Sequence, residues 1–152
     1  MKNSVFAILA FLFIACADKT TTEAIDFTAQ NEQEITEYLL ENNLTAQKSS
    51  TGLYYIINEQ GTGEQPNENS NVTVAYKGYF LNKSVFDESN AEGISFGLQQ
   101  VIKGWTEGIT YFNEGGNGIL LVPSHLGYGS FDNRGIPGGS VLIFEVTLIS
   151  VN

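Results

Sequence analysis

Two residue types that support metal, disulfide and nucleophilic chemistry are almost missing from this 152-residue sequence, which has one cysteine and one histidine. A single cysteine has no disulfide partner within the chain. One cysteine and one histidine, far apart in the sequence, give no metal-ligand spacing, so we expect neither a metal nor a cofactor. Positive charge is also scarce, because 7 Lys and Arg stand against 17 Asp and Glu for a net charge of −10. Such an acidic chain repels phosphate backbones, so we expect no nucleic-acid partner.

The remaining composition fits one domain rich in β-structure. With 152 residues and 42% hydrophobic content, the chain is long enough for one core and too short to suggest two. Its 16 glycines are spread between short apolar runs, which is typical of turns between strands.

The N-terminus has the pattern of a bacterial export signal. Met1, Lys2 and Asn3 give a short positive start, and an uncharged apolar run follows from residue 5 to residue 15. In a helix this run would cover about 16 Å, roughly half of a bilayer core of about 30 Å. Residues 1–15 are therefore predicted to be a signal peptide and not a membrane span.

Cys16 follows this run directly and resembles the lipidated cysteine of a bacterial lipobox, although Phe13 stands where that motif usually has leucine. Each methylene buried by an acyl chain contributes about 0.8 kcal/mol, so acylation would hold the chain at a membrane. The alternative is ordinary cleavage at Ala15-Cys16-Ala17, an A-x-A match that releases a soluble protein. We favour lipidation at Cys16, which predicts a lipid-anchored protein of a bacterial cell envelope, periplasmic or associated with the outer membrane.

A polar segment and a short helix come next. Residues 16–30 are Thr-rich and aperiodic, as expected of a flexible tether. A helical extension is predicted over residues 31–49, because Ile35, Tyr38, Leu39 and Leu40 follow a 3–4 spacing within residues 31–42. Such a helix either packs on the neighbouring domain or pairs with a second copy. It is short for pairing, so we expect packing and a monomer.

From residue 50 the sequence reads as strands separated by turns. Runs of β-branched and aromatic residues predict strands over residues 53–57, 72–80, 94–98, 119–122 and 141–151. One helix is predicted over residues 104–112, where Trp105, Ile109 and Phe112 share a face. Five strands and one internal helix predict an α+β fold with a mostly antiparallel sheet.

Several motifs occur in order within residues 50–152. They are Val74-Ala75-Tyr76-Lys77-Gly78, Val85-Phe86-Asp87, the octet Val101-Ile102-Lys103-Gly104-Trp105-Thr106-Glu107-Gly108, Tyr128-Gly129, and Leu142-Ile143-Phe144-Glu145-Val146. This ordered set resembles the FKBP-type peptidyl-prolyl cis-trans isomerases, in their bacterial lipoprotein form. The resemblance implies a strongly curved antiparallel sheet wrapped around a short helix, and residues 50–152 as the isomerase domain.

The resemblance also implies a pocket for a proline ring. Its substrate-binding residues would be Tyr76, Phe86, Ile94, Val101, Ile102, Trp105, Tyr128 and Phe144, with Trp105 as the floor and Ile94 on a rim where the family usually has an aromatic residue. Four residues would take part in catalysis: Asp87 as a buried polar group beside the aromatic wall, Tyr128 and the Ile102 N–H as donors to peptide carbonyls, and Trp105. Proline-containing polypeptides are the implied substrates, and macrolide inhibitors are possible ligands.

These residue types suit isomerisation of an X-Pro bond. The barrier of about 18–20 kcal/mol comes from amide resonance, and no nucleophile is needed to pass it. A twisted amide is less polar than a planar one, so an apolar pocket stabilises it preferentially. The motif Gly93-Ile94-Ser95-Phe96-Gly97 fits the serine-hydrolase elbow, but it lies in a predicted strand and is attributed to chance. Two alternatives remain open: a non-catalytic chaperone that binds proline segments, and an envelope lipoprotein that uses the scaffold for assembly.

Overall fold

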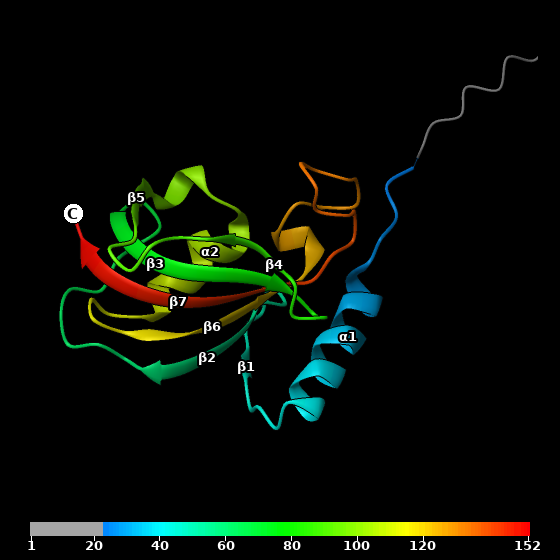
Figure 1. The fold of residues 1–152 in the computed structure, drawn as a ribbon, viewed down its shortest axis with the longest axis horizontal. Helices are drawn as coiled ribbons and strands as arrows, with labels where there is room; N and C mark the ends of the chain where they lie inside the picture. Colours follow the sequence, from blue (N-terminus) through cyan, green and yellow to red (C-terminus); the bar gives the residue numbers. More distant parts are fainter. Residues whose placement is uncertain (1–22) are drawn as a thin grey trace, which may run out of the picture.

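The computed structural model describes residues 23–152, in which an antiparallel sheet of seven strands curves around a short helix (Figure 1). The helices are α1 (Thr28–Glu41) and α2 (Lys103–Gly108), and the 3-10 turns are η1 (Leu98–Gln100), η2 (Ile109–Tyr111) and η3 (Ser124–Leu126). The strands are β1 (Gln47–Lys48), β2 (Tyr54–Glu59), β3 (Asn71–Phe80), β4 (Val85–Glu88), β5 (Ile94–Gly97), β6 (Asn117–Val122) and β7 (Leu142–Val151). Their order is β1-β2-β6-β7-β3-β4, and β5 also pairs with β3. The predicted α+β fold is confirmed.

The main core lies between α2 and the face of the sheet that curves around it. Ile109, just after α2, and Leu120 of β6 are both fully buried in this core. Two glycines one helical turn apart allow α2 to lie close to β6. A Cβ on Gly104 would meet the Val122 side chain at 2.6 Å, and one on Gly108 would meet Leu120 at 2.8 Å. This close contact holds Trp105, which lies between the two glycines, over the sheet.

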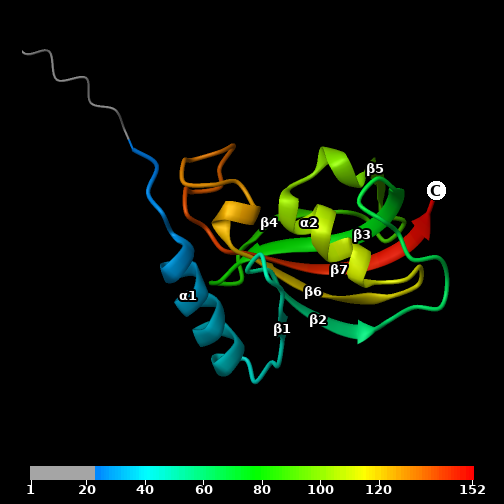
Figure 2. The ribbon, with the colours of Figure 1, turned by 180° about the vertical axis from the view of Figure 1, so that it is seen from behind.

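A second core lies on the opposite face of the sheet, where α1 packs at one end (Figure 2). Successive side chains of a strand point to opposite faces, so Leu121 and Ile143 reach this core while their neighbours reach the first. From α1, Ile35 is fully buried there. The expectation that the helix packs on the domain is confirmed. Leu40, placed by sequence on the apolar side, is instead 80% exposed.

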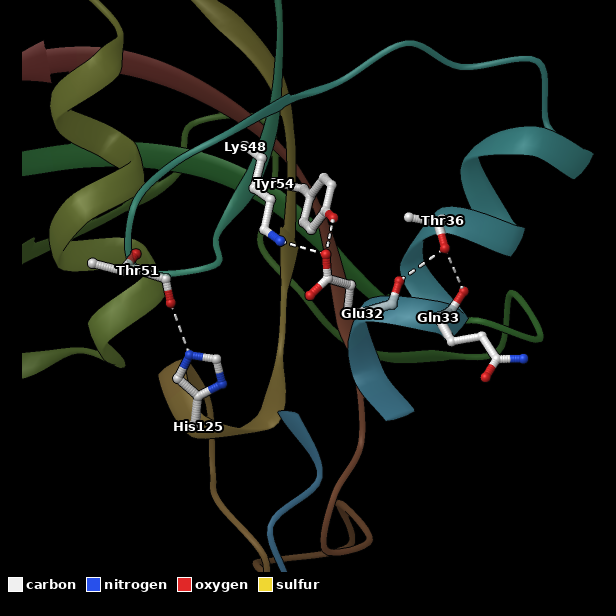
Figure 3. Close-up of polar contacts among 7 residues, drawn as sticks. All are labelled: Glu32, Gln33, Thr36, Lys48, Thr51, Tyr54 and His125. Carbon is white, nitrogen blue, oxygen red and sulfur yellow. Dashed lines mark hydrogen bonds and ion pairs between the residues drawn. The ribbon is translucent and has the colours of Figure 1, made fainter. Parts of the chain in front are cut away.

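Polar contacts hold α1 beside the strand that follows it (Figure 3). The Glu32 carboxylate forms an ion pair with Lys48, and the Tyr54 hydroxyl donates to it at 3.4 Å. Nearby, the ring of His125 bonds the Thr51 carbonyl through Nε2 at 2.9 Å. Thus the only histidine of the chain connects η3 to the turn before β2 and is not part of a metal cluster in the described residues.

Several boundaries differ from the sequence prediction. Helix α1 begins at Thr28, three residues before the predicted start, so residues 28–30 of the expected tether are helical. The apolar periodicity missed this turn because Thr28, Ala29 and Gln30 are all exposed. Two strands were not predicted, since β1 has two polar residues and β4 has only four residues at a sheet edge. The predicted helix over 104–112 divides into α2 and η2.

The predicted signal peptide over residues 1–15 and the predicted lipidation site Cys16 lie outside the described residues. Neither of the helices found within residues 23–152 has the length and apolar character needed to cross a membrane.

Candidate active site

All nine side chains predicted for the pocket lie around one cavity of about 380 Å³. The lining residues come from six parts of the fold, and they are Tyr76 on β3, Phe86 and Asp87 on β4, Ile94 and Phe96 on β5, Gln100, Val101, Ile102 and Trp105 around the start of α2, Tyr128 in the loop after η3, and Phe144 on β7. The curvature of the sheet brings these distant segments together, because β4 and β5 both pair with β3.

The indole of Trp105, which the sequence predicts as the floor, lines the cavity and is 5% exposed. Aromatic rings hold it edge-on from two sides. The Tyr76 ring lies 5.0 Å away at 90°, and the Phe144 ring lies 5.2 Å away at 84°. Such T-shaped pairs contribute about 0.5–1.5 kcal/mol each beyond their buried area. These contacts fix the orientation of the indole against the sheet.

The indole N–H of Trp105 is buried without a hydrogen-bond partner in the described residues. An unpaired buried donor costs about 1–3 kcal/mol, so most are satisfied in native structures. The structure tolerates this cost at the floor of the cavity, where an apolar ring is expected to bind.

Asp87 differs from the sequence prediction, which made it a buried polar group. It is exposed at the mouth of the cavity, because edge strand β4 turns its carboxylate toward solvent. The Tyr76 hydroxyl donates to Asp87 Oδ2 at 2.6 Å. Burial of Tyr76, and then this hydrogen bond, raise the pKa of the tyrosine well above its usual range. Tyr76 therefore stays protonated and keeps donating to the carboxylate.

Two groups predicted as donors lie at the entrance. The backbone N–H of Ile102 has no backbone acceptor within the described chain. The Ile102 carbonyl accepts from the backbone N–H of Trp105 at 2.9 Å. That bond begins α2 and leaves the Ile102 N–H facing away from the helix. Tyr128 also lines the cavity and is 41% exposed.

Two lining residues were missed by the sequence prediction, Phe96 and Gln100. Phe96 stands two positions after Ile94 on β5 and thus on the same face of the strand, so strand alternation could have found it. Its ring lies 5.4 Å from that of Trp105. Gln100 lies at the end of η1 and carries no sequence signal, since a polar residue in a short turn is usually a solvent contact.

The fold is a curved antiparallel sheet around a short helix, and its cavity is lined mainly by aromatic and branched side chains. The family described as FKBP-type peptidyl-prolyl cis-trans isomerase matches residues 62–149. FkpA of Escherichia coli strain K12, an FKBP-type isomerase by name, is 38% identical over 135 residues, covering 88% of this chain and 49% of that protein. FkpA of Buchnera aphidicola subsp. Schizaphis graminum is 43% identical over 107 residues, covering 68% of this chain and 42% of its own length.

Solved structures give the same result. The crystal structure of Escherichia coli FkpA has a TM-score of 0.73 and 40% identity, and the match covers 82% of this chain and 61% of that one. A peptidyl-prolyl isomerase of Pseudomonas syringae has a TM-score of 0.71 and 27% identity, covering 86% and 98%. The chain belongs to the FKBP-type peptidyl-prolyl cis-trans isomerase family. It spans less than half the length of the two FkpA sequences compared.

Proposed function

We propose that the chain accelerates cis-trans isomerisation of X-Pro bonds in polypeptides of the bacterial cell envelope. The observation that carries this proposal is the preformed aromatic cavity over Trp105 in a member of the isomerase family. A proline ring is a compact apolar group without an N–H, so it fits a cavity with few polar partners inside.

The cavity would lower the barrier by holding the twisted imide better than the planar one. Twisting removes amide resonance and makes the carbonyl less polar, so an apolar wall penalises the twisted form less. The Phe86 and Phe144 rings lie edge to face, with centroids 5.6 Å apart at 88°, and would form that wall. Each tenfold acceleration requires about 1.4 kcal/mol of preferential stabilisation, which one or two well-placed hydrogen bonds supply.

Polar groups at the entrance would orient the peptide. Tyr128 and the Ile102 N–H would each donate to a peptide carbonyl, which fixes the chain on both sides of the proline. Asp87 would hold the Tyr76 hydroxyl in place through the 2.6 Å hydrogen bond and would not transfer a proton, because no bond to hydrogen changes in the reaction. No metal or cofactor takes part in this scheme.

An isomerisation assay tests the proposal. With a short X-Pro peptide, and with a protein whose refolding is limited by proline isomerisation, the full chain is expected to raise the rate in proportion to its concentration. Trp105→Ala is expected to lower kcat/KM by about two orders of magnitude, roughly 3 kcal/mol, because the floor is removed. Ile143→Ala is the matched control, since Ile143 is fully buried in the second core and does not line the cavity.

A wild-type rate that does not exceed the uncatalysed one would refute the enzyme proposal. Prevention of aggregation by such an inactive chain would then favour the non-catalytic chaperone. A macrolide inhibitor of the family serves as a second probe, because it would compete with the peptide for the same cavity and be weakened by the same Trp105→Ala change.

The envelope location and the lipid anchor are part of the proposal and rest on the leader pattern and Cys16. Labelled fatty acid is expected to be incorporated into the full chain in a bacterial host and to be lost in Cys16→Ser. Label that persists in Cys16→Ser would refute acylation at this cysteine. Release of the wild type into the soluble fraction, without label, would favour ordinary cleavage at Ala15-Cys16-Ala17.

A further inference from the structure

A closed ring of four hydrogen bonds, which we name the Asn31 ring, joins α1 to the loop of residues 124–139 that carries Tyr128. Asn31 Nδ2 donates to the Gly139 carbonyl at 2.8 Å, and the Gly139 N–H donates to the Gly129 carbonyl at 2.9 Å. The Gly129 N–H donates to the Ser124 carbonyl at 2.8 Å, and the Ser124 N–H donates to Asn31 Oδ1 at 2.8 Å. The Asn31 side-chain amide donates at one end of this series of bonds and accepts at the other, so it closes the ring.

Asn31 is sealed inside the protein, with an exposed fraction of 0%. Its amide uses its oxygen and its nitrogen in the ring, and Nδ2 also donates to Glu34 Oε2 at 3.0 Å. Buried amides are retained only where their polar atoms are paired, and removal of one partner leaves the others desolvated and unpaired. In the Asn31 ring that would strand two backbone groups at once, the Ser124 N–H and the Gly139 carbonyl.

Further contacts keep the start of α1 against the same loop. The Phe27 ring lies on Gly139, where an added Cβ would come within 2.7 Å of ring atoms. The Ser130 hydroxyl donates to the Ile25 carbonyl at 2.5 Å. Figure 1 shows the loop, drawn in orange, beside the N-terminal end of α1. These contacts come from residues 25–31, which precede the part of the chain that the family match covers.

Tyr128 is the residue directly before Gly129, whose N–H and carbonyl are both members of the ring. The ring therefore fixes the backbone on the C-terminal side of Tyr128. The side chain of Tyr128 is 41% exposed, so packing alone does not fix it. Gly129 and Gly139 have φ of 82° and 78°, conformations that other residues rarely adopt, so the path of the loop through the ring is specified by these glycines.

We infer that Asn31 is a positioning residue for Tyr128, so that docking of the N-terminal helix sets the geometry of the cavity entrance. This inference rests on the proposed function, because Tyr128 is taken as a donor to the bound peptide. It adds to that function a residue that touches neither the cavity nor the substrate.

Two measurements on Asn31→Ala test the inference. Amide hydrogen exchange of Gly129 and Gly139 is expected to become at least tenfold faster, because the ring opens. The value of kcat/KM on an X-Pro peptide is expected to fall about tenfold. In a Tyr128→Phe background the same substitution is expected to change kcat/KM less than twofold, because the hydroxyl that the ring positions is already gone.

Leu39→Ala is the matched control, because Leu39 is buried on the same helix but contacts the second core. It is expected to lower stability, to leave kcat/KM within twofold, and to leave the exchange of Gly129 unchanged. If Asn31→Ala does not fold, Asn31→Ser replaces it, since the short hydroxyl stays neutral and keeps one polar group near the Ser124 N–H and the Gly139 carbonyl. Exchange and kcat/KM are then expected to lie between those of the wild type and an open ring.

Unchanged amide exchange at Gly129 in whichever Asn31 variant folds would overturn the inference. So would a loss of activity that is the same in the wild-type and Tyr128→Phe backgrounds, because that result indicates a purely structural role. A wild type without isomerase activity would refute the proposed function, and the exchange of Gly129 and Gly139 would still decide whether Asn31 holds the loop.

Discussion

Replacing Asp87 by asparagine tests what the exposed carboxylate at the cavity mouth contributes. Asparagine keeps the size of the side chain and an oxygen that accepts from the Tyr76 hydroxyl, so the substitution removes the charge and little else. The fold is expected to be unaffected, because Asp87 is exposed and surface substitutions usually change the unfolding free energy by less than about 0.5 kcal/mol.

The expected loss of kcat/KM in Asp87→Asn follows from the strength of the Tyr76–Asp87 hydrogen bond. A bond to an ionised acceptor is roughly twice as strong as one between neutral groups, and neutral bonds contribute about 1 kcal/mol net. Loss of the charge therefore weakens the hold on Tyr76 by about 1 kcal/mol, which corresponds to about a fivefold loss of kcat/KM. A direct electrostatic effect on the substrate adds little, because an exposed charge is screened by water and salt.

The assay is a double-mutant cycle on an X-Pro peptide. Asp87→Asn and Tyr76→Phe are each expected to lower kcat/KM about fivefold, and the double variant is expected to be no worse than either. The ratio of the wild-type kcat/KM to that of Asp87→Asn is expected to stay constant between pH 6 and pH 9, since Tyr76 keeps its proton there. A wild-type kcat/KM in Asp87→Asn would refute the reasoning. A double variant whose loss of transition-state stabilisation equals the sum of the two single losses would refute it as well.

Three further predictions concern the walls and the core. Gly78→Ala is expected to lower kcat/KM about tenfold in a folded protein, because its Cβ would lie 2.7 Å from the Phe86 ring and 2.9 Å from the Phe144 ring; an unchanged value in the same peptide assay would contradict this. Burial and a hydrogen bond to a carboxylate raise the pKa of Tyr111 to about 12, while tyrosines of the unfolded chain ionise near pH 10. The unfolding free energy should thus be steady below about pH 10 and fall as pH rises from 10 to 12, with a shallower fall in Tyr111→Phe. Ile35→Ala is expected to lower the unfolding free energy by about 2–5 kcal/mol in a urea titration, and a loss below 1 kcal/mol would show that α1 is not part of the cooperative unit.

Much of the fold could be predicted from local patterns. The strands that were found, such as β3 and β7, are ten residues long and rich in β-branched and aromatic side chains, so composition and turn residues marked them. The strands that were missed, β1 and β4, depend on partners elsewhere in the sheet for their conformation. The first turn of α1 was missed for another reason, because Thr28, Ala29 and Gln30 are all exposed and show no apolar periodicity.

The sequence predicted which residues line the cavity better than it predicted how exposed each of them is. Ordered motifs identified eight of the eleven lining residues, since aromatic and branched side chains carry the resemblance, and alignment with the family placed a ninth, Ile94, on the rim. The exposure of Asp87 was predicted wrongly, because sequence places it beside Phe86 in an apolar run but does not show that β4 is an edge strand. Gln100 was invisible, because its position depends on how η1 folds back toward the cavity.

The second core also determines how the protein would behave if it were shortened. Residues 62–149, the span that the family match covers, lack α1, β1 and β2, and they would leave Tyr79, Leu121 and Ile143 facing water. Contiguous apolar surface of this kind promotes aggregation, and the loss of β2 would also open the edge of β6. The N-terminal helix therefore covers apolar surface that would otherwise promote association, and we expect a shortened form to stay dispersed only if it keeps α1 from Thr28 onward.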